Sequence, residues 1–178
     1  MKSIVVYCAS SIGHDNNYRN VAQELGEKLS GKEIRLIYGG GNSGLMGVVA
    51  DAVMKNGGEV VGIIPNFLAE LEVAHQNLTE LHFVDTMHER KAKMVSMSDA
   101  VITLPGGYGT LDELFEILAW RQLKIFNGPV GVLNVNGFYD HLLTHCDKMV
   151  EAGFLRQENR ELIIIGETVD ELLEKMGF

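Results

Sequence analysis

The residues best suited to chemistry lie in a glycine-rich turn that ends with two acids. The turn consists of Pro105, Gly106, Gly107, Tyr108, Gly109, Thr110, Leu111, Asp112 and Glu113. It follows the β-branched run 100–104 and precedes apolar residues at helical spacing, which predicts a buried strand, a turn and a helix. Glycines let such a turn form a nest of N–H groups at the helix N-terminus, where phosphate binds well.

Glu113 needs a separate explanation, because a turn that only held phosphate would gain nothing from a carboxylate beside the anion. Two interpretations are open. Thr110 and Glu113 fit a capping box, in which both side chains bind helix backbone. Alternatively, Glu113 lies off the apolar stripe of Leu111, Leu114, Phe115 and Leu118 and faces a ligand. The positive end of the helix is then expected to keep Glu113 ionised.

A second unusual charge is Arg90, at the start of another predicted helix that has its own capping-box pattern at Thr86 and Glu89. The spacing of three and four places Arg90 on one face with Met87, Met94 and Met97. An arginine on an apolar stripe requires a partner. That partner is either an acid such as Asp99 or a ligand shared with Glu113.

The elements that must position these residues alternate between strand and helix along the whole chain. Apolar runs predict strands at residues 4–7, 34–38, 60–64, 81–84, 100–104, 130–133 and 162–165. Alternation with amphipathic stretches predicts an α/β fold, a three-layer doubly wound, Rossmann-like domain over residues 1–178 with a mainly parallel sheet of about seven strands. Residues 66–78 are weakly patterned and predict a lid, a partner contact or a short helix over 67–71.

The turns after three of these strands should meet at one edge of the sheet, because parallel strands all end on the same side. They are residues 8–11, 39–47 and 105–113. Gly39, Gly41 and Gly44 fit the G-x-G-x-x-G pattern of dinucleotide sites. The acid that would bind a ribose at the end of the next strand is missing, so a nicotinamide cofactor is disfavoured.

Composition excludes several partners. The 178 residues carry a net charge of −9, which leaves no basic surface for a nucleic-acid backbone or an anionic membrane. The first apolar run is too short for a signal peptide and no run is long enough for a membrane helix, so we expect a cytoplasmic protein. Cys8 and Cys146 lack metal-type spacing, and we expect Cys8 to fill a strand end rather than act as a nucleophile. The methionines are expected in the core or at subunit contacts.

Three motifs in order resemble the LOG, or "lonely guy", family of cytokinin riboside 5'-monophosphate phosphoribohydrolases, which also carries a lysine decarboxylase label. The motifs are residues 39–47, residues 87–91 and residues 105–113. The resemblance covers nearly the whole chain. It implies a Rossmann-like homodimer that hydrolyses the N-glycosidic bond of AMP or an adenine-modified, cytokinin-type nucleoside 5'-monophosphate, giving free base and ribose 5-phosphate. No metal or cofactor is expected.

By motif match, the family's catalytic pair falls on Arg90 and Glu113. The substrate contacts implied by the resemblance are Glu72, Lys91, Gly106, Gly107, Tyr108, Gly109 and Thr110. Physical chemistry agrees with the role of Glu113, since breaking a ribosyl bond develops positive charge on the sugar that a fixed carboxylate stabilises. Arg90 would align Glu113 or bind the ribose, and a guanidinium is a poor general acid.

The chain departs from the family pattern at four positions, Ala9, Lys124, Phe126 and Gly128. These departures bear on base preference and subunit contacts more than on reaction type. A decarboxylase is disfavoured because 178 residues are too few for the usual pyridoxal-phosphate fold. The alternative from another class is a non-enzymatic nucleotide or molybdenum-cofactor carrier, which has a similar fold and glycine turns.

Overall fold

The computed structural model describes residues 1–69 and 74–178. Within these residues the strands form one parallel sheet in the order β4-β3-β2-β1-β5-β6-β7. The strands are β1 (Ser3–Tyr7), β2 (Arg35–Tyr38), β3 (Val60–Pro65), β4 (Glu80–Val84), β5 (Ala100–Thr103), β6 (Val130–Leu133) and β7 (Ile163–Gly166). The doubly wound fold and every predicted strand are confirmed, because each buried strand is a short apolar run that sequence periodicity detects.

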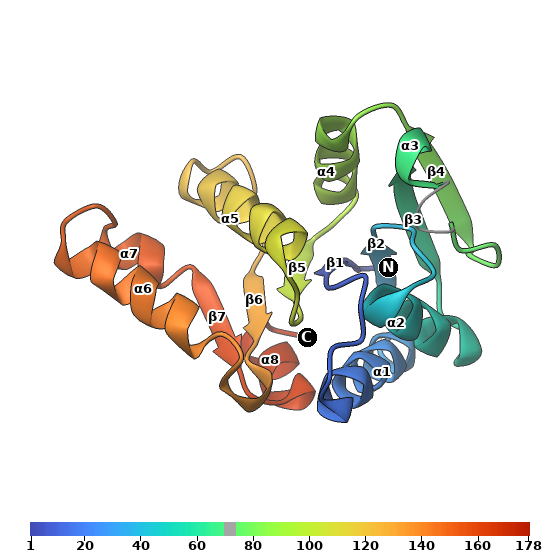
Figure 1. Cartoon of the computed structure of the whole chain (residues 1–178), viewed down its shortest axis with the longest axis horizontal. Coiled ribbons are helices and arrows are strands. Elements are labelled where there is room, and N and C mark those ends of the chain that lie inside the picture. Colours follow the sequence, from blue (N-terminus) through green and yellow to red (C-terminus); the bar gives the residue numbers. More distant parts are fainter. Residues whose placement is uncertain (70–73) are drawn as a thin grey trace.

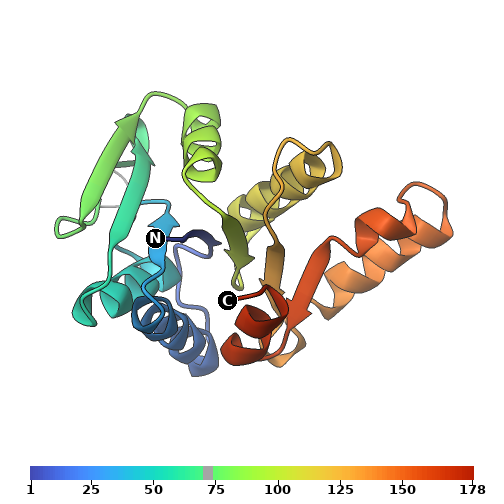
Figure 2. The same ribbon diagram turned by 180° about the vertical axis from the view of Figure 1, so that it is seen from behind.

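Helices cover both faces of the sheet, which gives three layers (Figure 1). The α-helices are α1 (Asn16–Gly31), α2 (Gly44–Lys55), α3 (Asn66–Ala69), α4 (Met87–Ser96), α5 (Tyr108–Gln122), α6 (Asp140–Glu151), α7 (Gln157–Arg160) and α8 (Val169–Lys175), and η1 (Val135–Gly137) is a 3-10 turn. One hydrophobic core joins α1, α2 and α8 to the sheet, and a second joins α4, α5 and α6 to the opposite face. The view from behind shows the same two groups of helices (Figure 2).

The strand order reverses beside β1. From β1 the chain moves outward through β2, β3 and β4, then returns through α4 to place β5 on the other side of β1. β1 pairs with both β2 and β5, with Val5 opposite Ile37 and Val101. The turns that follow β1 and β5 therefore separate at the carboxyl edge of the sheet, the position where doubly wound folds bind ligands.

The weakly patterned segment 66–78 is only partly described. The helix expected over 67–71 is present as α3 as far as Ala69. Ala74 then makes an isolated antiparallel bridge to Gly41, in the turn after β2. Among the described helices, none is both long and apolar enough to cross a membrane.

Candidate functional site

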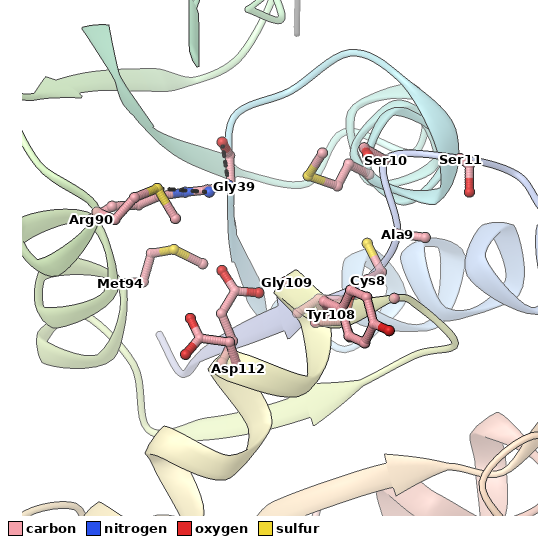
Figure 3. A pocket seen from close by; sticks show the side chains of 16 residues that line it. Cys8, Ala9, Ser10, Ser11, Gly39, Arg90, Met94, Tyr108, Gly109 and Asp112 are labelled. Atoms are coloured by element: carbon pink, nitrogen blue, oxygen red, sulfur yellow. Dashed lines mark hydrogen bonds between the residues drawn. The ribbon is translucent and has the colours of Figure 1, made fainter. Parts of the chain in front are cut away.

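A cavity of about 300 Å³ opens at the carboxyl edge of the sheet. Its walls come from the turn after β1, Gly39 after β2, the first turns of α4, and the start of α5 (Figure 3). Arg90 and Glu113 both line it, so the structure brings together the two residues predicted to act as a pair. Its volume lies at the lower end of the range for small-molecule sites.

The start of α5 is open to this cavity. α5 begins at Tyr108, Gly107 precedes it as the N-cap residue, and Gly107, Tyr108 and Gly109 are exposed. The first amides of a helix have no partner within the helix and carry its positive partial charge. Thr110 is buried in this first turn and also lines the cavity. The predicted phosphate turn thus has the geometry of an anion site.

Gly106 plays a different part from the three residues that follow it. A Cβ atom at Gly106 would lie 2.1 Å from Oγ1 of Thr110, so only glycine lets the chain fold this closely onto the first helical turn. Gly106 lines an adjoining hollow of about 210 Å³ rather than the cavity that holds Glu113. The structure therefore gives it a role in shaping the turn, and its contact with substrate stays a prediction.

The capping-box interpretation of Glu113 is wrong. The N-cap of α5 is Gly107 and has no side-chain hydrogen bond, and Thr110 lies inside the helix. Glu113 is a turn and a half beyond the cap and is too far along the helix to reach back. The apolar stripe also differs from the prediction, because Phe115 is exposed while Ile117 and Leu114 are buried.

The other capping box, at the start of α4, is confirmed. The backbone N–H of Glu89 donates to Oγ1 of Thr86 at 3.1 Å. The Glu89 carboxylate in turn accepts from the backbone N–H of Asp85 at 2.9 Å. This cap fixes the first turn of α4 and so the direction in which Arg90 leaves the helix.

Glu113 is half-buried, and its acidity is unusual. Burial raises the pKa of its carboxyl to about 7, and the neighbouring acids Asp112 and Glu116 raise it as well. The positive charges of Arg90 and Lys91 lower the pKa but do not outweigh burial. The expectation that the helix N-terminus keeps Glu113 ionised is therefore wrong near neutral pH, where both protonation states are populated. Such a carboxyl is suited to general acid–base chemistry.

Arg90 is held in place by backbone carbonyls. Its Nε donates to the carbonyl oxygen of Ile63 at 3.2 Å. Its Nη2 donates to the carbonyl oxygen of Gly39 at 3.1 Å (Figure 3). Nη1 lies 3.9 Å from Sδ of Met87. The side chain is buried, and a Cβ at Gly39 would lie 1.9 Å from Nη2, so any larger residue there would displace the guanidinium. The guanidinium thus presents a fixed positive charge to the cavity.

Asp99 is not the partner of Arg90 that the sequence suggested. The Asp99 carboxylate accepts a hydrogen bond from the backbone N–H of Ser3 at 2.8 Å, at the start of β1. It therefore ties the amino end of the sheet, the edge opposite the cavity. Spacing along α4 could not show this, because Asp99 lies beyond the end of the helix.

Lys91 joins α4 to α5. Its Nζ lies 3.0 Å from a carboxylate oxygen of Asp112 and 3.0 Å from one of Glu116, and only 8% of its side chain is exposed. It does not belong to the walls of the cavity, although its partner Asp112 does. The predicted contact between Lys91 and substrate stays a prediction, and Glu72 lies outside the described residues.

In the turn after β2, the second and third amides of α2, those of Leu45 and Met46, are already hydrogen-bonded to another turn. The N–H of Leu45 donates to the carbonyl oxygens of Ala9 and Ser11, and the N–H of Met46 donates to that of Ala9. Gly44 has a φ of +62°, and a Cβ there would lie 2.2 Å from the backbone of Ser10. These glycines therefore serve close packing between two turns. Two of the amides that a dinucleotide's phosphates would need are therefore already in use, which disfavours the dinucleotide alternative.

Sequence reasoning missed three methionines of the cavity wall, Met46, Met87 and Met94. The shared face of Met87, Arg90 and Met94 was the available signal. Cys8 also lines the cavity, and burial raises the pKa of its thiol, which keeps it protonated and unreactive. No cluster of three metal-binding side chains occurs within residues 1–69 and 74–178.

The departures from the family pattern have varied surroundings. Ala9 lines the cavity, so it is the one closest to substrate. Phe126 is buried in the core beneath α5, and Gly128 packs so closely that a Cβ would lie 1.9 Å from the carbonyl oxygen of Asp99. Lys124 is exposed, with a φ of +60°.

The fold and the cavity define a Rossmann-like α/β protein with a ligand site at its topological switch point. Residues 46–176 match the family model described as "Possible lysine decarboxylase". The chain belongs to this family, the LOG family that its motifs resemble.

Two curated relatives are each 47% identical over 175 residues, which is 98% of this chain. One is "Probable cytokinin riboside 5'-monophosphate phosphoribohydrolase LOGL2" of Oryza sativa subsp. japonica, with 72% of its length covered. The other is "Cytokinin riboside 5'-monophosphate phosphoribohydrolase LOG3" of Arabidopsis thaliana, with 81% covered. A molybdenum cofactor binding protein from Rippkaea orientalis shares the fold at 20% identity, with a TM-score of 0.71 over 98% of this chain and 94% of that one.

Proposed function

We propose that this protein hydrolyses the N-glycosidic bond of AMP or of an adenine-modified nucleoside 5'-monophosphate, releasing free base and ribose 5-phosphate. The observation that carries the proposal is the arrangement of one cavity, in which Glu113, Arg90 and the open start of α5 converge. The names of the relatives, which are phosphoribohydrolases, agree with this chemistry.

The phosphate is assigned to the start of α5, where the amides of the first turn and the helix dipole favour an anion. The residues around it are Gly107, Tyr108, Gly109 and Thr110, all of which line the cavity. A phosphate held there places the sugar along α5 toward Glu113. Proximity and fixed orientation then lower the barrier to reaction.

In the reaction, the bond between the anomeric carbon and the base nitrogen breaks, and its electron pair leaves with the base. Positive charge develops on the sugar, and the ionised Glu113 carboxylate stabilises it. Water attacks the anomeric carbon. Since its pKa is about 7, Glu113 can accept the proton that the water loses and then return it to the departing base. Arg90, which scarcely releases its proton, positions the ribose and Glu113 instead.

The test is to incubate the protein with AMP, and in parallel with an N6-substituted AMP, and to measure free base and ribose 5-phosphate. Release of both products in equal amounts supports the hydrolase. Tight retention of an intact nucleotide with no base released would favour the carrier alternative. Hydride transfer from NADPH would instead favour a nicotinamide-dependent dehydrogenase, the activity implied by the dinucleotide pattern at Gly39, Gly41 and Gly44.

We further propose a homodimer located in the cytoplasm. The family resemblance supports the dimer, and the large exposed apolar side chains of Leu123 and Ile125, at the end of α5, agree with a buried contact. Cys8 and Cys146 are free and buried rather than joined in a disulfide, which is typical of a reducing compartment. Light scattering of the purified protein and fractionation of cells test the two statements.

A further inference from the structure

Tyr139 lies beside the phosphate turn, residues 105–110, but does not line the cavity. It is the residue before α6, and only 2% of its surface is exposed. Its neighbour Phe138 lines the adjoining hollow of about 210 Å³ together with Gly106 and Gly107. An effect of Tyr139 on a ligand in the cavity therefore has to act through the turn.

The Tyr139 hydroxyl holds the chain where it leaves β5. Its O–H donates to the carbonyl oxygen of Leu104 at 2.7 Å, and both groups are buried. Burial raises the pKa of this hydroxyl most and Cys8 raises it further, whereas a hydrogen bond from the backbone of Gly106 lowers it. A hydroxyl can donate and accept at once, so this one contacts the peptide groups on both sides of Pro105.

The peptide group that follows Pro105 is also held from its other edge, where the backbone N–H of Ala9 donates to the carbonyl oxygen of Pro105 at 3.2 Å. Proline fixes its own φ and restricts the residue before it, so few torsions stay free as the chain leaves β5. The next two residues are glycines, which resist rotation least. The direction of the amides at the start of α5 therefore depends on these outside contacts.

Tyr139 is itself fixed by contacts that do not involve the turn. Its backbone N–H donates to Oδ1 of Asn134 at 2.7 Å, and Nδ2 of Asn134 donates to the Asp140 carboxylate at 2.7 Å. The backbone N–H of Asn134 donates to the carbonyl oxygen of Gly166, at the end of β7, at 2.8 Å. The rings of Phe138 and Tyr139 meet edge to face, with centroids 4.8 Å apart. The hydroxyl thus reaches the turn from a framework tied to the sheet.

We propose that Tyr139 is a positioning residue for the phosphate of the substrate: its hydroxyl aims the amides at the start of α5 into the cavity without touching the ligand. This inference rests on the proposed function and names a residue outside the cavity that sets the affinity for phosphate. Removing the hydroxyl leaves the buried carbonyl of Leu104 without a donor, and the turn shifts to satisfy it. Ligands that carry a phosphate should then bind less tightly, and ligands without one should not.

The experiment compares the wild type with Tyr139→Phe, which loses only the hydroxyl. Calorimetry measures the Kd for ribose 5-phosphate and for adenosine, which lacks the phosphate. We expect the Kd for ribose 5-phosphate to rise about tenfold and the Kd for adenosine to stay within about twofold. The KM for AMP should rise about tenfold while kcat stays within about threefold, because phosphate is bound equally in the ground state and the transition state.

Tyr38→Phe is the matched control. Tyr38 ends β2, is fully buried, and its hydroxyl has no hydrogen-bond partner among the described residues. This variant removes the same atom without removing a hydrogen bond, so it should leave both Kd values unchanged. Denaturant titration of each variant ensures that binding is measured on folded protein.

A second variant approaches Tyr139 from its other end. Asn134→Ala keeps the hydroxyl and removes the acceptor of the Tyr139 backbone N–H. We expect the Kd for ribose 5-phosphate to rise about threefold, a smaller effect than that of Tyr139→Phe because the bond to Leu104 remains. If Tyr139→Phe does not fold, an unchanged Kd in Asn134→Ala overturns the inference.

The inference is overturned if Tyr139→Phe is less stable but binds ribose 5-phosphate as the wild type does, since the hydroxyl then only supports the fold. It is also overturned if adenosine and ribose 5-phosphate lose affinity equally. Failure of the wild type to bind ribose 5-phosphate would contradict the phosphate position of the proposed function, and the inference with it. Absence of base release with ribose 5-phosphate still bound contradicts the hydrolase alone.

Discussion

The turns after β2 and β5 both join a strand to a helix through several glycines, and both end at the carboxyl edge of the sheet. After β2, the second and third amides of α2, those of Leu45 and Met46, donate to the carbonyls of Ala9 and Ser11. After β5, the corresponding amides of α5 face the cavity. A glycine pattern therefore indicates that another group packs closely against the backbone of the turn. Whether that group is a second turn of the protein or a ligand depends on what lies next to the helix N-terminus.

We expect the largest effect from a substitution of Glu113, which tests whether the helix that follows the β5 turn carries the catalytic residue. Glu113→Gln removes the carboxylate and keeps the shape of the side chain. We expect turnover of the preferred nucleotide to fall by a factor of about 10² to 10³, as for loss of one transition-state partner, with binding retained. Single-turnover kinetics and calorimetric titration measure the two quantities. Full activity in a correctly folded variant would remove Glu113 from the mechanism.

The raised pKa of Glu113 predicts how the activity of the site beside the β5 turn depends on pH. Since the ionised carboxylate is the active form, kcat/KM should fall about tenfold per unit below pH 7 and level off above it. Glu113→Gln should lack this slope in its residual activity. A wild-type profile with no break between pH 6 and pH 8 contradicts the assignment.

As pH rises, the free energy of unfolding should fall, whereas kcat/KM should rise. The pKa of Glu113 is raised in the folded protein from an ordinary value of 4.5, so the stability it contributes is fully present below pH 4.5 and is lost as pH rises through about 7. At about 1.4 kcal/mol per unit, the loss is at most about 3.5 kcal/mol. Urea unfolding at pH 5 and pH 8 should show the loss in the wild type and not in Glu113→Gln. Equal pH dependence in the two proteins would show that Glu113 is not the titrating group.

A substitution in the β2 turn should affect the stability of the fold rather than ligand binding. Gly44 has a left-handed φ of +62°, and an added Cβ would lie 2.2 Å from the backbone of Ser10. We expect Gly44→Ala to lower the free energy of unfolding by about 2 kcal/mol or more, measured by denaturant titration. A variant as stable as the wild type would show that the contact between the β1 and β2 turns is loose.

The matched change in the β5 turn should have the smallest effect on folding. Nothing lies within 4 Å of a Cβ placed at Gly109, which is in the first turn of α5. Gly109→Ala should leave stability unchanged or raise it by up to about 1 kcal/mol, because alanine favours helix. The methyl group would stand where phosphate approaches, so the Kd for AMP should rise severalfold. Unchanged affinity would place the phosphate elsewhere.

The sequence predicted the fold well for a simple reason. Buried parallel strands are short apolar runs, and their alternation with helices leaves few topologies. The pairing of Arg90 with Glu113 could be predicted because both follow strands that end at one edge. Thr110 and Glu113 match a capping box in sequence, and that interpretation of Glu113 fails because the chain already turns into helix at Tyr108.

Other features depend on contacts between distant segments, which a linear pattern does not contain. The raised pKa of Glu113 arises mainly from its burial in the folded protein. The pairing of Lys91 with Asp112 and Glu116 requires knowing how α4 lies against α5. The methionine wall was interpreted as core because core and cavity walls share the same apolar composition.

The hydrogen bonds of Arg90 affect how activity is inferred from related sequences. Its side chain donates to the buried carbonyls of Gly39, just after β2, and Ile63, within β3. Losing the guanidinium would leave these acceptors without a donor, a cost to folding whether or not catalysis occurs. A relative that only stores or transports a ligand would have the same reason to keep this arginine. The Glu113 carboxylate makes no comparable hydrogen bond to the backbone among the described residues. An acid at position 113 is therefore a better indicator than Arg90 that a relative is a hydrolase.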